Sequence, residues 1–418
     1  MPLLPRLIAL GIALAPAAAG QAPEAPPPAA PPAPLATPAL DLGQAAALGV
    51  ERLLALQERY LPDEPVPRLP ADQLAAWQQK ERDRLARARA EAGELCNEWP
   101  YEGVYRVGRE IPAGYRVGGS AIVCLALLET PGYRADPARQ AAVERAVEFI
   151  LSMLAQHPAL ESGRKQGYDV RGWGFVYALE LCLALRRAQV LDPERSVRIE
   201  ALVGDLLARL ADNQTAAGGW NYADDRRHSP FQTGVTLLAL LEARAQGFEV
   251  APALIERALE AMVSGRNPRT GAFAYSGPGS EPMHASAARA ALAELCFFKL
   301  GQSSVAELER AILGFFDGYE HLLARKSRQG THEGPFGIAP YYFYFGHVYT
   351  ALAIEALPEA RRSGHRERLR ALLQSTREPD GTWNDRIFPR SAAYGTAMAL
   401  RALFAAEPPL KPAAPSGG

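Results

Sequence analysis

The sequence predicts an all-α protein in which about six helical hairpins close into a toroid. Two kinds of helical segment alternate between residues 41 and 406. One kind is amphipathic, with Val143, Val147 and Leu154 on a single face. The other kind is apolar nearly all round and recurs roughly every 50–60 residues. Because such helices must be buried on every side, they predict an inner layer enclosed by an outer one.

Start signals and segment spacing support this hairpin organisation. Asp136 and Asp192 each stand before a proline, which is typical of a helix start, and Ser304 with Glu307 matches a capping box. Strand-like alternation is nearly absent, and closing the hairpins into a ring removes the raw ends of an open stack. The six apolar segments are AIVCLALLE (121–129), FVYALELCLAL (175–185), GVTLLALLEA (234–243), ASAARAALAELCFF (285–298), HVYTALAIEAL (347–357) and YGTAMALRALF (394–404).

The first 20 residues have the pattern of an export signal. An apolar run at 7–15 is followed by small residues at 17–19, as a signal peptidase requires. A Pro/Ala-rich linker follows over residues 21–40, and a short tail that we expect to be disordered ends the chain at 407–418. We therefore expect export to the periplasm or the outside, with no transmembrane helix in the mature chain.

Composition excludes several functions. The chain has 45 basic and 46 acidic residues, a formal net charge of −1, so it has no general electrostatic hold on nucleic acid. Its four cysteines include no CxxC pair, which argues against a zinc ribbon or a redox motif. The spacing leaves open whether Cys124 and Cys182 form a disulfide, and the sequence leaves the oligomeric state open.

The first hairpin is interrupted by an insertion over residues 60–117. It contains a charged segment, predicted to be a helix from Asp72 to Glu91, and an aromatic-rich loop. Insertions of this size are often lids over cavities, although a solvated decoration is an equal alternative. The aromatic residues of the loop are Trp99, Tyr101, Tyr105 and Tyr115.

The loops before several inner helices repeat a glycine-x-aromatic pattern, in which glycine permits a tight turn and the ring packs over the hairpin end. The stretch Gln214-Thr-Ala-Ala-Gly218-Gly-Trp220 is similar to the Q-x3-G-x-W repeat of squalene–hopene cyclases. This resemblance to the prenyltransferase/squalene-oxidase repeat superfamily covers residues 41–406 and implies an (α/α)6 barrel. The aromatic pairs are Gly218/Trp220, Gly271/Phe273, Gly334/Phe336 and Gly381/Trp383.

This chain has only part of the catalytic residues of these relatives. Class II terpene cyclases carry a D-x-D-D run before an inner helix, where this chain has Phe231 and Gln232, and Asp225 lies in the preceding loop. Protein prenyltransferases hold zinc with an Asp and a Cys on one inner helix and a His on the next. His347 matches that His, but the preceding helix start, at His284, offers neither partner. We therefore expect no metal and no cofactor.

The remaining candidates lie where inner helices begin. His284 and His347 open neighbouring inner helices, and Tyr344 lies about one turn before His347, so these three are candidate acid–base residues together with Asp225. Because six helix N-termini would face one mouth, an anionic ligand group is slightly favoured. The candidate ligand-binding residues are Asp169, Arg171, Trp173, His228, Arg289, Tyr341 and Tyr342.

Three classes of function follow. The first is an exported toroid that binds a small-molecule, lipid or saccharide ligand in its central cavity, without cyclase or prenyltransferase chemistry. The second is an enzyme of another chemistry, such as a polysaccharide lyase or hydrolase that uses histidine and tyrosine as acid and base. The third is a divergent terpenoid-processing enzyme.

Overall fold

The computed structural model describes residues 41–62, 68–161, 169–222, 227–275, 279 and 281–405. All of them belong to one compact unit. The expected signal peptide (1–20), linker (21–40) and tail (407–418) lie outside the described residues. No helix in the described part of the chain is long and apolar enough to cross a membrane.

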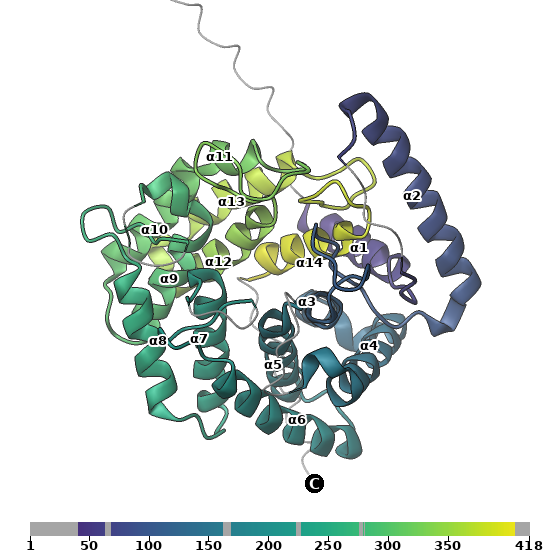
Figure 1. Cartoon of the computed structure of the whole chain (residues 1–418), viewed down its shortest axis with the longest axis horizontal. Helices are drawn as coiled ribbons and strands as arrows, with labels where there is room; N and C mark the ends of the chain where they lie inside the picture. The colour runs from purple at the N-terminus through teal and green to yellow at the C-terminus, as the bar shows by residue number, and fades with distance from the viewer. Residues whose placement is uncertain are drawn as a thin grey trace, which may run out of the picture. The chain divides into compact units, whose positions relative to one another are not determined.

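The predicted inner layer is a closed ring of six helices (Figure 1). Each inner helix packs against the next, and the last contacts the first. The described residues contain fourteen α-helices and only isolated β-bridges, so the all-α toroid is confirmed. The inner helices are α3 (Ala113–Glu129), α5 (Arg171–Ala188), α7 (Pro230–Ala245), α9 (Ala287–Lys299), α12 (Tyr342–Ala356) and α14 (Ser391–Leu403).

Six amphipathic helices form the outer layer. The predicted caps are present: Asp136 and Asp192 accept backbone N–H bonds of the first turn, and Ser304 forms a capping box with Glu307. The outer helices are α1 (Leu42–Ala55), α4 (Pro137–Gln156), α6 (Pro193–Asp212), α8 (Pro252–Ser264), α10 (Val305–Asp317) and α13 (Ser363–Ser375), with a short α11 (Tyr319–Leu323) after α10. Short 3-10 turns are η1 (Gly93–Leu95), η2 (Tyr133–Ala135), η3 (Pro158–Leu160), η4 (Met283–Ser286) and η5 (Glu359–Arg361).

Tryptophans fasten three of the hairpins in the same way. The indole N–H of Trp220 donates to the carbonyl oxygen of Leu210 on the outer helix (2.7 Å), and its backbone N–H donates to Thr233 Oγ1 on the inner helix (2.9 Å). Trp383 makes the same two bonds, to Leu373 (2.8 Å) and Thr396 (3.0 Å). Trp99 repeats them with Leu53 (2.7 Å) and Ser120 (2.9 Å). The repeated aromatic residue therefore locks each loop between the two layers.

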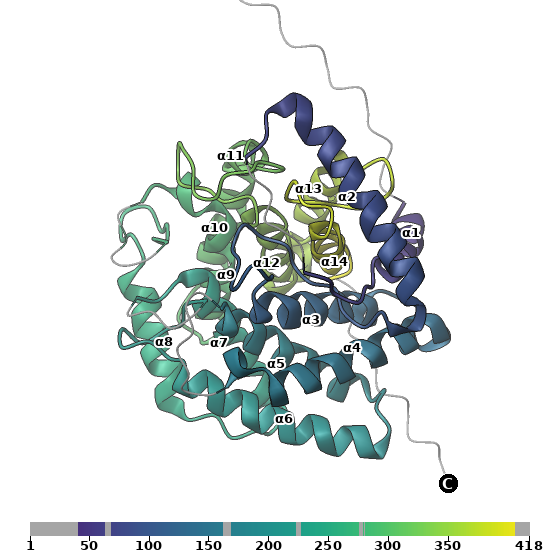
Figure 2. The ribbon, with the colours of Figure 1, turned by 45° about the vertical axis from the view of Figure 1, so that its right-hand side comes forward.

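Trp99 also changes the interpretation of the insertion. Because Trp99 anchors the first hairpin, the aromatic loop up to Tyr115 belongs to the ring. The element added to the ring is helix α2 (Ala71–Ala92), which agrees with the helix predicted for residues 72–91. Helix α2 lies outside the ring beside α1 (Figure 2). It packs Trp77 edge-on against Phe388 (6.3 Å between ring centroids), and Gln78 donates to the carbonyl oxygen of Ile387 (2.8 Å).

The cysteines settle the question of a disulfide. Cys96, Cys124, Cys182 and Cys296 are all buried free thiols. Burial raises the pKa of Cys182 to about 12, so this thiol stays protonated. Burial also raises the pKa of Cys124 and Cys296, so the three cysteines within inner helices are inert apolar side chains of the helix packing.

Candidate functional site

The histidines expected to face one cavity are separated by the structure. His347 is fully buried between the layers, where its ring contacts Phe315 and Tyr319 and its Nδ1 lies 2.8 Å from the carbonyl oxygen of Phe343. Burial lowers its pKa to about 4. Helix α12 begins at Tyr342, earlier than expected, and this register turns His347 toward the outer layer. Its position is therefore a correction to the sequence-based expectation.

The structure also places Tyr344 and His284 elsewhere than the sequence predicted. Tyr344 is also buried, and its hydroxyl donates to the carbonyl oxygen of Thr376 at the end of an outer helix (3.3 Å). His284 is exposed on the turn before α9, and its ring contacts His321 and Phe336 (5.2 and 5.9 Å between centroids). Neither side chain lines a central cavity. Asp225, the fourth catalytic candidate, lies outside the described residues.

Several candidate ligand-binding residues serve the packing of the loops. Arg289 is buried, donates to the carbonyl oxygens of Phe273 and Ala285 (2.7 Å each), and pairs with Glu281. Asp169 and Arg171 form a buried ion pair of 2.7 Å at the start of α5. His228 is buried, and burial lowers its pKa. Arg289 thus donates to the carbonyl oxygen of Phe273, as the hydroxyl of Thr233 donates to that of Trp220 (3.1 Å).

Trp173, a candidate ligand-binding residue, belongs to a compact group of aromatic rings near the start of α5. It lies 5.3 Å from Tyr115, 5.7 Å from Tyr101 and 6.2 Å from Tyr394, measured between ring centroids. These rings come from α3, α5, α14 and the loop after Trp99. We call Tyr101, Tyr115, Trp173, Tyr177 and Tyr394 the Tyr101 cluster.

Tyr341 and Tyr342 form a second group at the same end of the ring. Phe231 stacks on Tyr342 (4.3 Å between centroids), and the hydroxyl groups of Tyr222 and Tyr341 share a hydrogen bond of 2.8 Å. Tyr275 and Tyr341 keep part of their surface exposed. We call Tyr222, Phe231, Tyr275, Tyr341 and Tyr342 the Tyr341 cluster.

Arg386 connects the two clusters. Its guanidinium carbon lies 5.8 Å from the ring centroid of Tyr101 and 5.8 Å from that of Tyr341. Its Nε donates to the Tyr101 hydroxyl (2.7 Å), and the same hydroxyl lies 3.4 Å from Oδ2 of Asp385. Asp385, Tyr101 and Arg386 thus form a buried polar triad within a wall of aromatic rings.

The triad is incompletely satisfied. Asp385 Oδ1 and Arg386 Nη1 are buried and have no hydrogen-bond partner among the described residues. Burial raises the pKa of the Asp385 carboxyl to about 7, against the opposing effect of the Arg386 charge. A carboxyl with this pKa can donate or accept a proton near neutral pH, which makes Asp385 the strongest candidate acid–base residue in the described part of the chain.

The register of the loops explains why the triad forms. Tyr101, Tyr222, Tyr275 and Asp385 each stand two residues after the aromatic residue of their loop, namely Trp99, Trp220, Phe273 and Trp383. The anchoring of these aromatic residues directs the later side chains toward the ring's interior. The first three positions hold tyrosines, and Asp385 alone among these four is a carboxyl. The sequence alone does not bring Asp385 and Tyr101 into register, because the insertion hides the first anchor, Trp99.

Two cavities lie at opposite ends of the ring. One, of about 220 Å³, is lined by Gly103, Arg106 and Ile387, close in sequence to Tyr101 and Arg386, and by Arg68 and Phe388. The other, of about 690 Å³, opens between the carboxyl ends of all six inner helices. In this cavity Arg401 forms ion pairs with Glu129 (2.9 Å) and Glu180 (3.4 Å), and leucine side chains line much of the rest. The candidate site and the larger cavity are therefore distinct.

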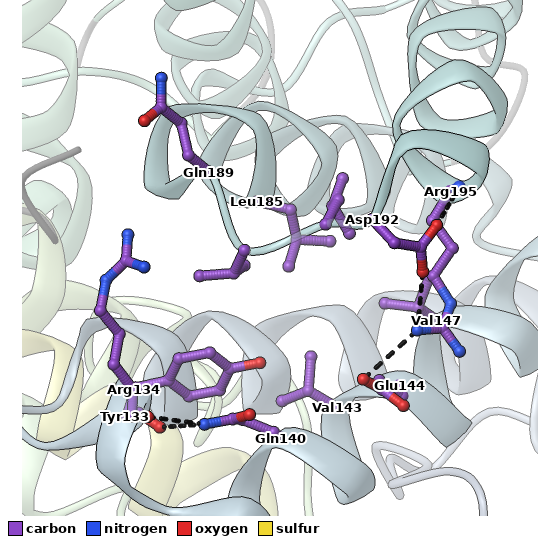
Figure 3. A pocket seen from close by; sticks show the side chains of 12 residues that line it. Tyr133, Arg134, Gln140, Val143, Glu144, Val147, Leu185, Gln189, Asp192 and Arg195 are labelled. Carbon is purple, nitrogen blue, oxygen red and sulfur yellow. Dashed lines mark hydrogen bonds and ion pairs between the residues drawn. The ribbon is translucent and has the colours of Figure 1, made fainter. Parts of the chain in front are cut away.

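A third pocket, of about 320 Å³, lies between η2 and α4 on one side and the end of α5 and the start of α6 on the other (Figure 3). Its polar side chains are engaged with one another: Gln140 donates to the carbonyl oxygen of Tyr133 (3.1 Å), and Arg195 pairs with Glu144 (3.3 Å). None of the candidate residues from the sequence lines it. Among the described residues, no group of three His, Cys, Asp or Glu side chains could hold a metal ion.

Comparison with solved structures supports the fold. The chain is similar to an α-1,6-mannanase from a Salegentibacter species, with a TM-score of 0.53 and 11% identity, over 88% of this chain and 100% of the other. Inactive variants of that enzyme bound to mannotetrose and mannotriose match over the same shares, at 11% identity and TM-scores of 0.51 and 0.52. No family model and no curated protein matches the chain. The toroid is thereby shown, and the cyclase-like superfamily is not.

Proposed function

We propose that this protein is a carbohydrate-active enzyme that cleaves glycosidic bonds, with Asp385 as the proton donor. The observation that carries the proposal is a buried carboxyl with a pKa of about 7, set among tyrosines and a tryptophan where the inner helices begin. Aromatic faces pack against the C–H faces of sugar rings, and a carboxyl protonated near neutral pH can protonate a glycosidic oxygen. The mannanase likeness supports this class of substrate.

In this mechanism the proton of Asp385 passes to the bridging oxygen as its bond to the anomeric carbon breaks. A water molecule attacks that carbon, and a second carboxylate takes the proton from the water. We propose Asp225 for this role on the sequence alone, because it is an acidic residue three positions after Tyr222; it lies outside the described residues. Asp169 is less suited, because Arg171 already holds it as an ion pair.

A saccharide receptor without turnover is the second candidate, since the same aromatic wall could bind sugars. A terpenoid-processing role has less support, because Phe231 stacks on Tyr342, and Gln232, which stands at an acid position of the cyclases, donates to the carbonyl oxygen of Gly172 (2.8 Å). Both side chains therefore serve packing. We also propose that the protein is exported, because residues 1–20 have the pattern of a signal peptide.

Cleavage can be tested with a panel of oligosaccharides that includes α-1,6-linked mannose, followed by the release of reducing ends. Asp385→Asn should lower the rate by on the order of 100-fold to 10,000-fold, because the amide cannot donate the proton. Asp380→Asn is the matched control, since it makes the same change at an exposed position of the same loop. An Asp385→Asn enzyme as fast as the wild type would contradict the proposal. Binding without cleavage by the wild type would favour the receptor.

A further inference from the structure

The arginines around the site differ in how their charge is balanced. Most are paired with a carboxylate, which removes any need for a ligand to neutralise them. Arg386 is the exception: it forms no ion pair with any described residue, although it is almost completely buried. The paired arginines are Arg106 with Glu102 (2.6 Å), Arg171 with Asp169 (2.7 Å), Arg325 with Glu333 (2.7 Å), Arg390 with Glu58 (2.8 Å) and Arg289 with Glu281.

The contacts of Arg386 leave one side of its guanidinium unused. Nε donates to the neutral hydroxyl of Tyr101 (2.7 Å), whereas Nη1 is buried without a partner. The aromatic rings of Tyr101 and Tyr341 attract the cation but accept no conventional hydrogen bond in the plane of the guanidinium. A buried, unpaired donor on a charged group is costly, so the fold retains a strong anion-binding group at this place.

Asp385 is a neighbouring carboxyl that interacts with this charge, and it balances the charge only in part. Asp385, the nearest carboxyl in the chain, has a pKa of about 7 and is therefore only partly ionised at neutral pH. Its Oδ1 atom also lacks a partner. The amino ends of the inner helices meet at this end of the ring, and their dipoles add partial positive charge. The partial positive charge of these helix ends therefore adds to the charge of Arg386.

We infer that Arg386 binds the carboxylate of a uronic-acid unit, so that the substrate of the proposed glycosidase is an acidic saccharide. This inference rests on the proposed function and adds the class of sugar. A guanidinium presents its donors in a plane that matches a carboxylate, and one carboxylate balances its single charge.

The direct test compares each acidic sugar with its own neutral counterpart. Trisaccharides of galacturonic, mannuronic and glucuronic acid are titrated into the full chain by calorimetry, alongside the same trisaccharides with each carboxyl group reduced to an alcohol. At least one acidic form should bind the wild type 10- to 100-fold more tightly than its reduced form, as expected for a charge-assisted hydrogen bond. This comparison requires no variant, so it does not depend on how a mutant folds.

Variants then assign the preference to one residue. Arg386→Met should abolish the difference between the acidic and reduced forms, and Arg386→Lys should keep part of it because the charge remains. Arg198→Met, at an exposed ion pair with Glu148, is the control and should leave the difference unchanged. A wild type that binds or cleaves reduced sugars as well as acidic ones would overturn this inference and leave the glycosidase proposal intact. If no saccharide of either form binds or is cleaved, both proposals are wrong.

Discussion

Replacing Asp385 with asparagine should make the protein more stable at alkaline pH while it removes the proposed proton donor. The carboxyl ionises at about 7 in the folded chain, against a reference value of 3.8. Because the folded-state pKa is raised, the folded state binds the proton more tightly, and the wild type loses stability as pH rises from 3.8 toward 7. Asparagine carries no such penalty, since its amide never ionises.

The magnitude follows from the width of that window. Each pKa unit corresponds to about 1.4 kcal/mol, so the full difference of roughly three units amounts to about 4 kcal/mol, of which about 3 kcal/mol falls between pH 5 and pH 8. Urea unfolding of both proteins at these two pH values measures it. Asp380→Asn, exposed in the same loop, controls for the amide itself. An Asp385→Asn advantage that is equal at pH 5 and pH 8 would refute the reasoning.

Three further predictions concern the frame of the ring. Burial lowers the pKa of His347 from 6.5 to about 4, so the wild type should lose about 2 kcal/mol of unfolding free energy relative to His347→Gln between pH 7 and pH 5. Urea unfolding at the two pH values measures this loss, and a difference that does not change with pH would mean that the ring is exposed to solvent. Thr233→Val should lower the free energy of unfolding by about 1–3 kcal/mol, because the backbone N–H of Trp220 loses its hydrogen-bond acceptor. An unchanged urea midpoint would show that this hydrogen bond does not anchor the loop. Gly114→Ala should lower the melting temperature, because the added methyl group would clash with the carbonyl oxygen of Val170. Gly204→Ala should raise it slightly, because the space around Gly204 is open. Equal effects of the two variants would contradict this packing.

The fold was predictable because its signals are local. Caps at Asp136, Asp192 and Ser304 lie within one turn of the helices they start, and the inner helices are apolar on all sides wherever they lie in the chain. Helix α2 was also predicted, because its charged composition differs from both layers. Ring closure needed the repeat count and the family resemblance, since no single segment encodes it.

The site was predictable only in part, because side-chain direction depends on helix register. Trp173, Tyr341 and Tyr342 were candidates from the sequence, and the structure places them in the two aromatic clusters that Arg386 connects. His347 was misplaced, since a helix that starts five residues earlier turns the ring toward the outer layer. Asp385 was not among the candidate residues, because its burial next to Tyr101 depends on contacts between residues 284 positions apart.

Asp385 can act as the proton donor only if its carboxyl is protonated near neutral pH. Infrared difference spectroscopy, with Asp385→Asn as the subtraction reference, can follow the protonation of Asp385 in the wild type between pH 4 and pH 9. The structure predicts a carboxylic-acid band that disappears with a midpoint near pH 7. A midpoint near 4 would show an ordinary ionised carboxylate and would contradict the assignment of Asp385 as the proton donor.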